Sequence, residues 1–326
     1  MDFNIDTFIK DKLGVTPLGA VGAYVGSLTG SNYGIVAGTM IGNQLNQPVG
    51  ETVLQLWNGY VGYRVQFWAE KIKFDYEFQL EEYKKEKIPP KTARESIVQS
   101  PSFIHAENVN KLRDRIREKV DQISTEQRKA PDLPLIGPLL MDAEYFADSK
   151  VIRELFSNLV AASVNKDYEK EVHLAFAAII KQLSPHDAKF LMELPYQSEN
   201  AIVSYYLINR NDEANYEVLY DNVYLKSIDD EYDYSDTLSI ENLDRLGIIK
   251  IDLKCRIKEI TDSDLYDKTD MYYVYEKNHL FDEVKSIAQN TFGKDGAIEI
   301  EEKSFMLTDW GMQFMKVCIL QGQSKN

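Results

Sequence analysis

The sequence predicts a mainly α-helical protein with an N-terminal glycine-zipper segment, a helical middle domain and a C-terminal α+β domain of winged-helix-like order. Three observations predict this class. Glycines recur every fourth residue near the N-terminus, apolar residues recur every three or four over much of the middle, and the composition shifts to Tyr, Asp and β-branched residues after about residue 200. We place the boundaries at 1–50, 51–183 and 184–326, in keeping with two or three domains for 326 residues.

The first element is a stretch without any charged side chain, from Leu13 to Gly50. A four-residue glycine period places small residues on one face of a helix, where two backbones can approach as closely as in membrane helix pairs. Each glycine costs a water-exposed helix about 1 kcal/mol relative to alanine, so close packing has to offset several kcal/mol. We therefore expect membrane action and oligomerisation at the six periodic glycines: Gly22, Gly26, Gly30, Gly34, Gly38 and Gly42.

Two conformations are open to residues 17–45. A single helix of about 29 residues would be roughly 43 Å long, enough to span a bilayer with tilt. Alternatively, a turn at residues 30–34 separates two arms that are each too short to span alone. The alternatives to membrane action are a hairpin that packs against a soluble body and a flexible linker, which needs no period. In a pore, the polar side chains of the segment would suit a wet lining: Ser27, Thr29, Ser31, Asn32 and Thr39.

Residues 51–87 are predicted to form one long helix that Pro89 and Pro90 end. Its apolar stripe follows steps of three or four: Val53, Trp57, Val61, Val65, Trp68, Ile72, Tyr76 and Leu80. Further apolar residues are expected to broaden the same stripe: Leu54, Leu56, Tyr60, Phe67, Phe74 and Phe78. The two tryptophans fit a helix–helix core better than a membrane-interface belt.

More helices are predicted up to residue 193. A charged helix covers about 107–130, and Pro131, Pro134 and Pro138 indicate a turn-rich connection. Two short helices follow with a break near residues 148–149, and the segment VHLAFAAIIKQL indicates another. The next helix opens at Ser184, with proline at the first helical position and aspartate at the third, Asp187.

The C-terminal domain combines helices and strands. The segment SIENLDRLGIIKIDL predicts a helix closed by Gly247 and then a strand, AIEIEEKSFMLT predicts two short strands, and Thr308 caps a last helix. The order helix, helix, strand, strand, helix is that of a winged-helix module with an insertion at about 261–293. The helix that would contact DNA in such a module, SIENLDRLG, has one arginine and two acidic residues, which disfavours DNA binding.

Charge and reactive residues restrict the function classes. Residues 201–326 carry 14 basic and 25 acidic side chains, a net of −11 out of −15, so we expect no nucleic-acid partner and allow for a basic protein partner. Cys255 and Cys318 are too few for a disulfide framework or a zinc site, and the four histidines are isolated in sequence. The acids of residues 228–236 indicate a solvated loop rather than a cation site. We expect no enzyme activity, no cofactor and no metal.

Residues 87–192 resemble the Abi-alpha family of bacterial abortive-infection proteins. The resemblance depends on LPLIGPLLMDAEYFADSKVIRELFSNLVAASV and VHLAFAAIIKQLSPHDAKFLMEL, of which IIKQLSPHDAKFL is the most specific part. The later RLGIIKI and LTDWGMQFMKVC are similar to the family's C-terminal pattern more loosely. The resemblance implies a helical middle domain and a role in anti-phage defence. It brings no catalytic motif and does not cover the glycines.

Together these observations lead to two hypotheses. In the first, the protein is an abortive-infection effector, cytoplasmic at rest, that receives a phage-derived trigger through its C-terminal domain. It then oligomerises with other copies and permeabilises the inner membrane through the glycine zipper. In the second, it is a soluble defence interaction protein whose glycine hairpin is a packing element and whose partner kills the cell.

Overall fold

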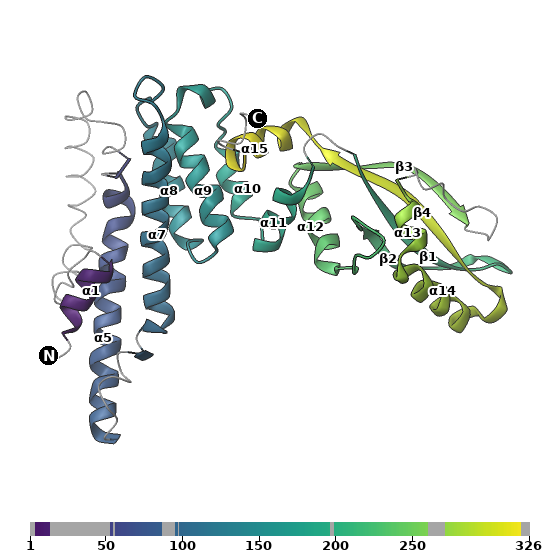
Figure 1. Cartoon of the computed structure of the whole chain (residues 1–326), viewed down its shortest axis with the longest axis horizontal. Helices are drawn as coiled ribbons and strands as arrows, with labels where there is room; N and C mark the ends of the chain where they lie inside the picture. Colours follow the sequence, from purple (N-terminus) through teal and green to yellow (C-terminus); the bar gives the residue numbers. More distant parts are fainter. Residues whose placement is uncertain are drawn as a thin grey trace. The chain divides into compact units, whose positions relative to one another are not determined.

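Helices dominate the chain, and a four-stranded sheet lies in its C-terminal part (Figure 1). The computed structural model describes residues 4–13, 53–54, 56–86, 95–96, 98–195, 199–259 and 271–320. The chain divides into two units. Unit 1 comprises residues 1–182 together with 317–326, and unit 2 comprises residues 183–316.

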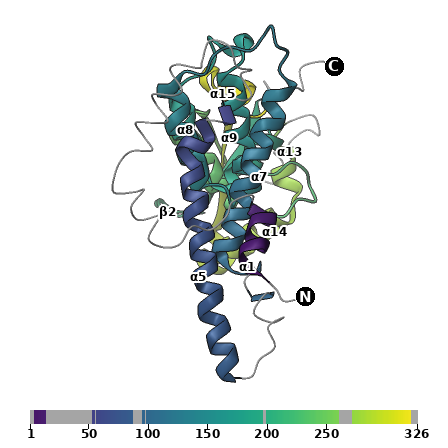
Figure 2. The same cartoon turned by 90° about the vertical axis from the view of Figure 1, so that its left-hand side faces the viewer.

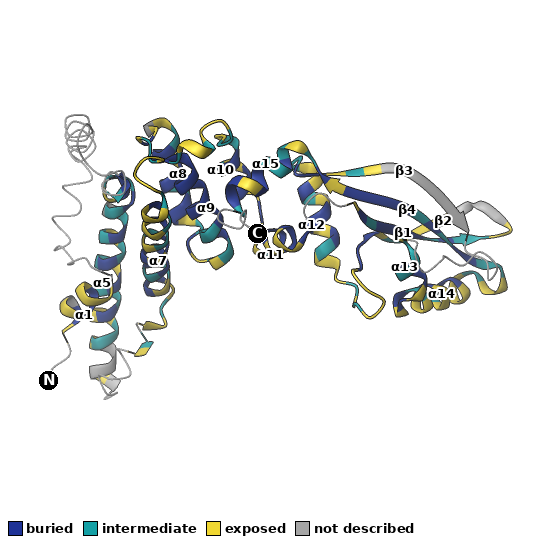
Figure 3. Ribbon diagram, turned by 45° about the horizontal axis from the view of Figure 1, so that its top comes forward, coloured by how far each residue is buried: buried dark blue, intermediate teal, exposed yellow. Residues whose placement is uncertain are grey.

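Unit 1 is helical. The predicted stripe of the long helix faces the core: Trp68 and Leu80 are partly buried, and the other six residues are buried, namely Val53, Trp57, Val61, Val65, Ile72 and Tyr76. In α9, ten of the 14 residues are buried (Figure 3). The described elements of unit 1 are α1 (Ile5–Leu13), a π-turn (Asn58–Gly62), α5 (Tyr63–Glu86), α7 (Pro101–Gln122), α8 (Leu133–Tyr145), α9 (Lys150–Ser163), a 3-10 turn (Lys166–Tyr168) and α10 (Ala175–Ile180).

Two predicted boundaries in unit 1 are wrong. The charged helix begins earlier than residue 107 because the Ser100 side chain caps it, accepting a hydrogen bond from the amide of Phe103 at 3.3 Å. It ends at Gln122. Pro134 and Pro138 lie inside α8 rather than in a connection. Pro134 is tolerated in the first turn, where an amide has no helical acceptor, and Pro138 gives up one helical bond.

An ion pair with two donors joins α7 to α9. The Arg115 guanidinium donates to both carboxylate oxygens of Glu154 at 2.8 Å, and the Lys119 ammonium lies 2.7 Å from the same carboxylate. The hydrogen bond from Arg115, with Lys119 as the second donor, lowers the pKa of Glu154 to about 2 although partial burial opposes the shift.

This pKa predicts a pH-dependent stability of unit 1. Because the folded pKa of Glu154 lies below its unfolded value, the stabilisation is present above about pH 4.5 and is lost as the pH falls toward 2. We expect a loss of roughly 1–2 kcal/mol, reduced by solvent screening because a third of the side chain is exposed. Urea denaturation at pH 5 and pH 3 checks this against Glu154→Gln, in which the loss should be smaller by that amount. Equal losses in both proteins would contradict the assignment.

Unit 2 is built on an antiparallel sheet with the strand order β2-β1-β4-β3. One face of β1 and β4 packs against α14 through alternating residues such as Val203, Tyr205 and Ile300. α12 contacts β2 and β3, the two edge strands, so the sheet curls around this helix. The elements are α11 (Pro185–Glu193), β1 (Asn200–Asn209), β2 (Asp212–Val223), α12 (Tyr234–Arg245), β3 (Ile249–Glu259), α13 (Tyr273–Lys277), α14 (His279–Phe292), a 3-10 turn (Gly293–Asp295), β4 (Gly296–Leu307) and α15 (Asp309–Cys318).

The expected order of helices and strands is present in unit 2, with two differences. α11, α12, β3, β4 and α15 follow one another as predicted, but the hairpin of β1 and β2 lies between the two helices. AIEIEEKSFMLT is one strand rather than two, because its charges are paired within the sheet. The Lys303 ammonium lies 3.1 Å from Glu301 and 2.9 Å from Asp221.

Lys303 is nearly buried and remains a cation. Burial lowers the pKa of Lys303, but its hydrogen bonds to Asp221 and Glu301 outweigh burial and raise the pKa above the usual value. A lysine that acts as a nucleophile or a base needs a lowered pKa, so Lys303 has the environment of a structural ion pair.

Two glycines of unit 2 lie against the backbone of a neighbouring segment. A Cβ at Gly311 would lie 1.9 Å from the carbonyl oxygen of Ile248, and a Cβ at Gly296 would lie 2.2 Å from that of Ala288. Gly247 ends α12 at a φ of +71°, as expected of a helix-closing glycine. The close contact at Gly311 fixes the start of α15 beside the turn that follows α12.

Among the residues that the structure describes, no helix is both long enough and apolar enough to cross a membrane.

Candidate functional site

The predicted zipper positions lie outside the described residues, and so do the predicted pore-lining side chains: Gly22, Gly26, Gly30, Gly34, Gly38 and Gly42, with Ser27, Thr29, Ser31, Asn32 and Thr39. What the structure shows is how the segment is attached at its two ends. α1, which precedes it, buries Ile9 fully and packs against α5 and α7. Val53, Leu56 and Trp57, which follow it, are also buried.

A polar junction of unit 2 joins α11 to α12. The predicted N-terminal cap of α11 is confirmed, because the Ser184 hydroxyl accepts from the Asp187 amide and the Asp187 carboxylate accepts from the Ser184 amide. The same buried carboxylate accepts from the Ser239 hydroxyl at 2.6 Å and from the Asn242 side-chain amide at 2.8 Å, both on α12. One aspartate thus caps its own helix and binds the next.

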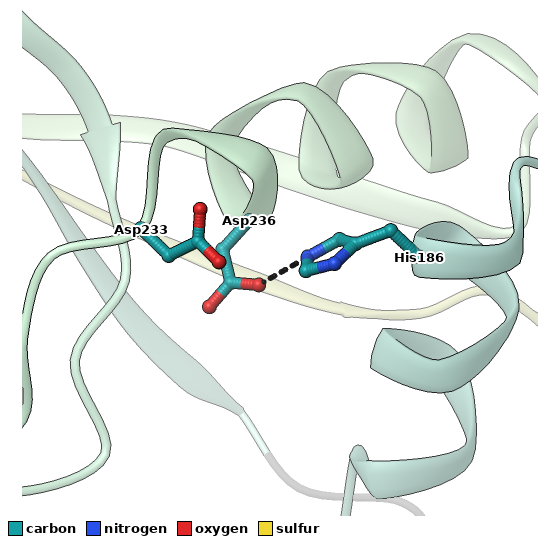
Figure 4. Close-up of side chains that lie close together, drawn as sticks. All are labelled: His186, Asp233 and Asp236. Atoms are coloured by element: carbon teal, nitrogen blue, oxygen red, sulfur yellow. Dashed lines mark hydrogen bonds and ion pairs between the residues drawn. The ribbon is translucent and has the colours of Figure 1, made fainter.

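The neighbouring histidine makes a second bond across this junction. His186 Nε2 lies 2.8 Å from Asp236 Oδ1, and Asp233 stands beside this pair at the start of α12 (Figure 4). The ligand atoms of the three residues lie within 4.8 Å of one another, which is the spacing of a candidate cation site. Part of the acidic 228–236 loop therefore meets a histidine that is distant in sequence.

The carboxylates of this region also have roles within their own loop and helix. Asp233 accepts from the Ser235 amide at 2.8 Å as the cap of α12, and this bond lowers the pKa of Asp233. Asp236 lies in the first turn of α12, where the helix dipole favours an anion and opposes a cation. Nearby, Asp230 accepts from the amides of Lys226 and Ser227. Asp233 thus caps a helix and Asp230 fixes the turn before it. The prediction of a solvated loop did not foresee these structural roles.

A different kind of site lies on α5. The predicted stripe of this helix is not one broad face: Phe67, Phe74 and Phe78 are 60%, 68% and 57% exposed. Their spacings of seven and four residues place them within about 40° of each other on the helix, roughly 180° from the buried Ala69, Ile72 and Tyr76. We call these three residues the phenylalanine stripe. Phe67 also lies edge-on to Trp68, with ring centroids 5.9 Å apart.

The buried face of α5 is part of a well-formed core. Ala69, Ile72 and Tyr76 pack with α1 residues and with Phe103 of α7. At the start of α5, Arg64 pairs with the buried Glu144 of α8 and lies over the Tyr145 ring, 4.7 Å from its centroid. Figures 1 and 2 both show the C-terminal end of α5 extending past the other helices of unit 1.

Sequence reasoning missed both sites for identifiable reasons. His186 and Asp236 are 50 residues apart, and a pairwise contact at that separation leaves no periodic signal. The phenylalanines followed the helical period, but a period alone does not tell how many faces are covered. One signal was available in the sequence: the three phenylalanines lie about half a helical turn away from Ile72, so they could not share its buried face.

A family model described as abortive infection alpha matches residues 104–318, more than half of the chain. The matched region runs from within α7 to the end of α15 and includes the junction of α11 with α12, whose SPHD sequence supplies the cap and both cross-helix residues. The charge-free segment and α5 precede it. No curated protein and no solved structure matches the chain.

Proposed function

The chain belongs to the abortive infection alpha family, and from this membership we propose that it is a defence effector that oligomerises and permeabilises the inner membrane through residues 22–42. The observation that carries the membrane step is the unbroken four-residue glycine period inside a stretch without charge, from Leu13 to Gly50. Close helix–helix packing inside a membrane is the setting that makes such a period favourable.

The proposal assigns separate roles to the parts of the chain. The glycine segment enters the membrane, where Ser27, Thr29, Ser31, Asn32 and Thr39 line a wet path between copies. The helical body holds the segment in the cytoplasm before activation. Unit 2, with its winged-helix-like order of elements and its acidic charge, receives a phage-derived trigger such as a basic protein. The proposal requires no catalytic step and no cofactor.

The competing function is that of a soluble interaction protein. One observation favours it: both flanks of the glycine segment are buried in unit 1, as expected if the segment were a packing element of the same body. In that case another protein kills the cell, and substitutions in the glycine face would act on stability instead of on leakage.

Dye release from liposomes separates the two functions. We expect activated protein to release a small dye, with a release that rises more steeply than linearly with protein concentration, because single copies carry too few helices to surround water. Gly34→Leu should reduce release to background, since a leucine side chain separates helices that glycine allows to touch. Val36→Leu lies off the glycine face and is the matched control, with release near that of the wild type.

Equal release by the wild type and Gly34→Leu, or no release by an oligomer that has demonstrably formed, would favour the soluble interaction protein. The comparison uses full-length protein throughout. Far-ultraviolet circular dichroism of each variant shows whether the helical body is unchanged.

A further inference from the structure

The fold brings a histidine and two aspartates together at the junction of α11 with α12. His186 lies in the first turn of α11, Asp233 caps α12, and Asp236 lies in the first turn of α12. The sequence predicted no metal because its histidines are isolated, but the contact of His186 with Asp236 spans 50 residues of the chain. Imidazole nitrogens and carboxylate oxygens are both ligands of divalent cations in proteins.

We propose that His186, Asp233 and Asp236 bind a divalent transition-metal ion of the zinc class, which joins α11 to the start of α12. Calcium and magnesium take oxygen ligands, whereas one nitrogen together with two oxygens is a set that zinc accepts. Three protein ligands leave the fourth position of a tetrahedral zinc ion to water. The site is independent of the proposed membrane step.

The distances within the cluster are close to those of a metal site. Two ligand atoms that each lie about 2.1 Å from an ion, at an angle of about 90–110°, are about 3.0–3.4 Å apart. His186 Nε2 and Asp236 Oδ1 lie 2.8 Å apart, so they need to separate only slightly. The ligand atom of Asp233 lies within 4.8 Å of both, and a rotation of this exposed side chain can bring it to the ion.

The hydrogen bonds of the cluster leave positions for the ion. Figure 4 shows the Asp236 carboxylate between Asp233 and the imidazole ring of His186. A proton lies between Nε2 and Oδ1 in the metal-free protein, and zinc takes its place when Nε2 becomes a ligand. Asp233 accepts from the Ser235 amide through Oδ1, but a carboxylate has two oxygens, so one group can cap the helix and bind the ion.

The charge at the junction favours a dication. The dipole of α12 opposes a cation, but it amounts to about half a positive charge, whereas the two carboxylates of the site carry two negative charges. Burial raises the pKa of the neighbouring Tyr224, and carboxylates around it raise this pKa further although the Lys226 ammonium opposes them. These carboxylates are Asp236, Asp230 and Glu193. The local field is therefore negative overall.

Calorimetric titration with zinc chloride tests the site. The protein is the full-length chain without an affinity tag, freed of metal by a chelator that is then removed. We expect each chain to bind a single zinc ion. Because binding to the folded state alone stabilises it, the Tm should rise by roughly 5–10 °C at a zinc concentration of about a hundred times Kd.

Single substitutions separate the three ligands from general charge attraction. Asp233→Asn and Asp236→Asn remove a charge but keep a residue that caps helices well, and His186→Ala removes the nitrogen ligand. Each should weaken zinc binding about tenfold or more, since losing a residue that only supports a ligand already costs that much. Asp229→Asn in the same loop and His279→Ala on α14 are the matched controls. Both should stay within about twofold of the wild type, because salt screens exposed charges.

The inference would be overturned by the absence of zinc binding, or by equal weakening in Asp229→Asn and Asp236→Asn, which would indicate charge attraction alone. Tighter binding of calcium than of zinc would contradict the assigned class of ion. Far-ultraviolet circular dichroism of each variant verifies that unit 2 is folded. Zinc binding without dye release defeats only the membrane function, and dye release without zinc binding defeats only this inference.

Discussion

Gly311→Ala is expected to unfold unit 2 under conditions in which the wild type is folded. A Cβ at this position would lie 1.9 Å from the carbonyl oxygen of Ile248 and 2.8 Å from its carbon, and a backbone group cannot rotate away. Thr308 holds the same turn, because its amide donates to the Ile248 carbonyl and its hydroxyl donates to the Gly247 carbonyl at 2.6 Å. α15 would have to move off the turn together with its buried residues.

We expect this substitution to lower the free energy of unfolding by about 3 kcal/mol or more, the upper range for overpacking. Urea denaturation followed by circular dichroism measures the change. Gly247→Ala is the matched control in the same turn. A Cβ there meets no atom within 4 Å, so only the positive φ opposes it, at about 1–2 kcal/mol. A smaller effect at Gly311 than at Gly247 would show that the backbone contact is not fixed.

Asp187→Ala is expected to have the second largest effect. The carboxylate is buried and accepts three hydrogen bonds, from the Ser184 amide, the Ser239 hydroxyl and the Asn242 amide. Its removal leaves a fully buried hydroxyl on α12 without this acceptor and ends the capping box of α11. Hydrogen bonds to charged groups contribute about 1.5–3 kcal/mol each but are not additive, so we expect a loss of about 3 kcal/mol.

The neighbouring substitutions should have graded effects. Ser239→Ala removes one of the three donors and is expected to lose about 1–2 kcal/mol, with a coupling to Asp187→Ala in a double-mutant cycle. His186→Ala breaks a bond on a side chain that is 39% exposed, so its effect should stay within about 1 kcal/mol. Additivity of the Asp187 and Ser239 substitutions would contradict a shared network.

Much of the local structure followed from the sequence. The period of Val53, Trp57, Val61 and Val65 predicted the buried face of the long helix, and the capping sequence at Ser184 predicted where α11 begins. Both features could be predicted because they are local in sequence. A helix cap is formed by residues of one turn, and an amphipathic stripe is formed by residues of one helix.

The missed features depend on partners far along the chain. The segment AIEIEEKSFMLT was predicted as two short strands, but Lys303 pairs with Glu301 and with Asp221 on β2, so its charge is neutralised inside one continuous strand. The hairpin of β1 and β2 inserts between helices that would otherwise be neighbours. His186 meets Asp236 across the junction of α11 with α12, which Asp187 also bridges. The function of the zipper glycines stays a prediction, since they lie outside the described residues.

The division of the chain into units has a consequence for its synthesis on the ribosome. Unit 1 consists of residues 1–182 together with residues 317–326, so its sequence is interrupted by all of unit 2. The Asn158 side-chain amide donates at 2.7 Å to the Cys318 carbonyl, which is translated 160 residues later. At about 5–20 residues per second, roughly 8–30 seconds separate the two partners. Unit 1 can therefore be completed only after the whole of unit 2 has been translated, so the contact between α9 and the end of α15 forms late.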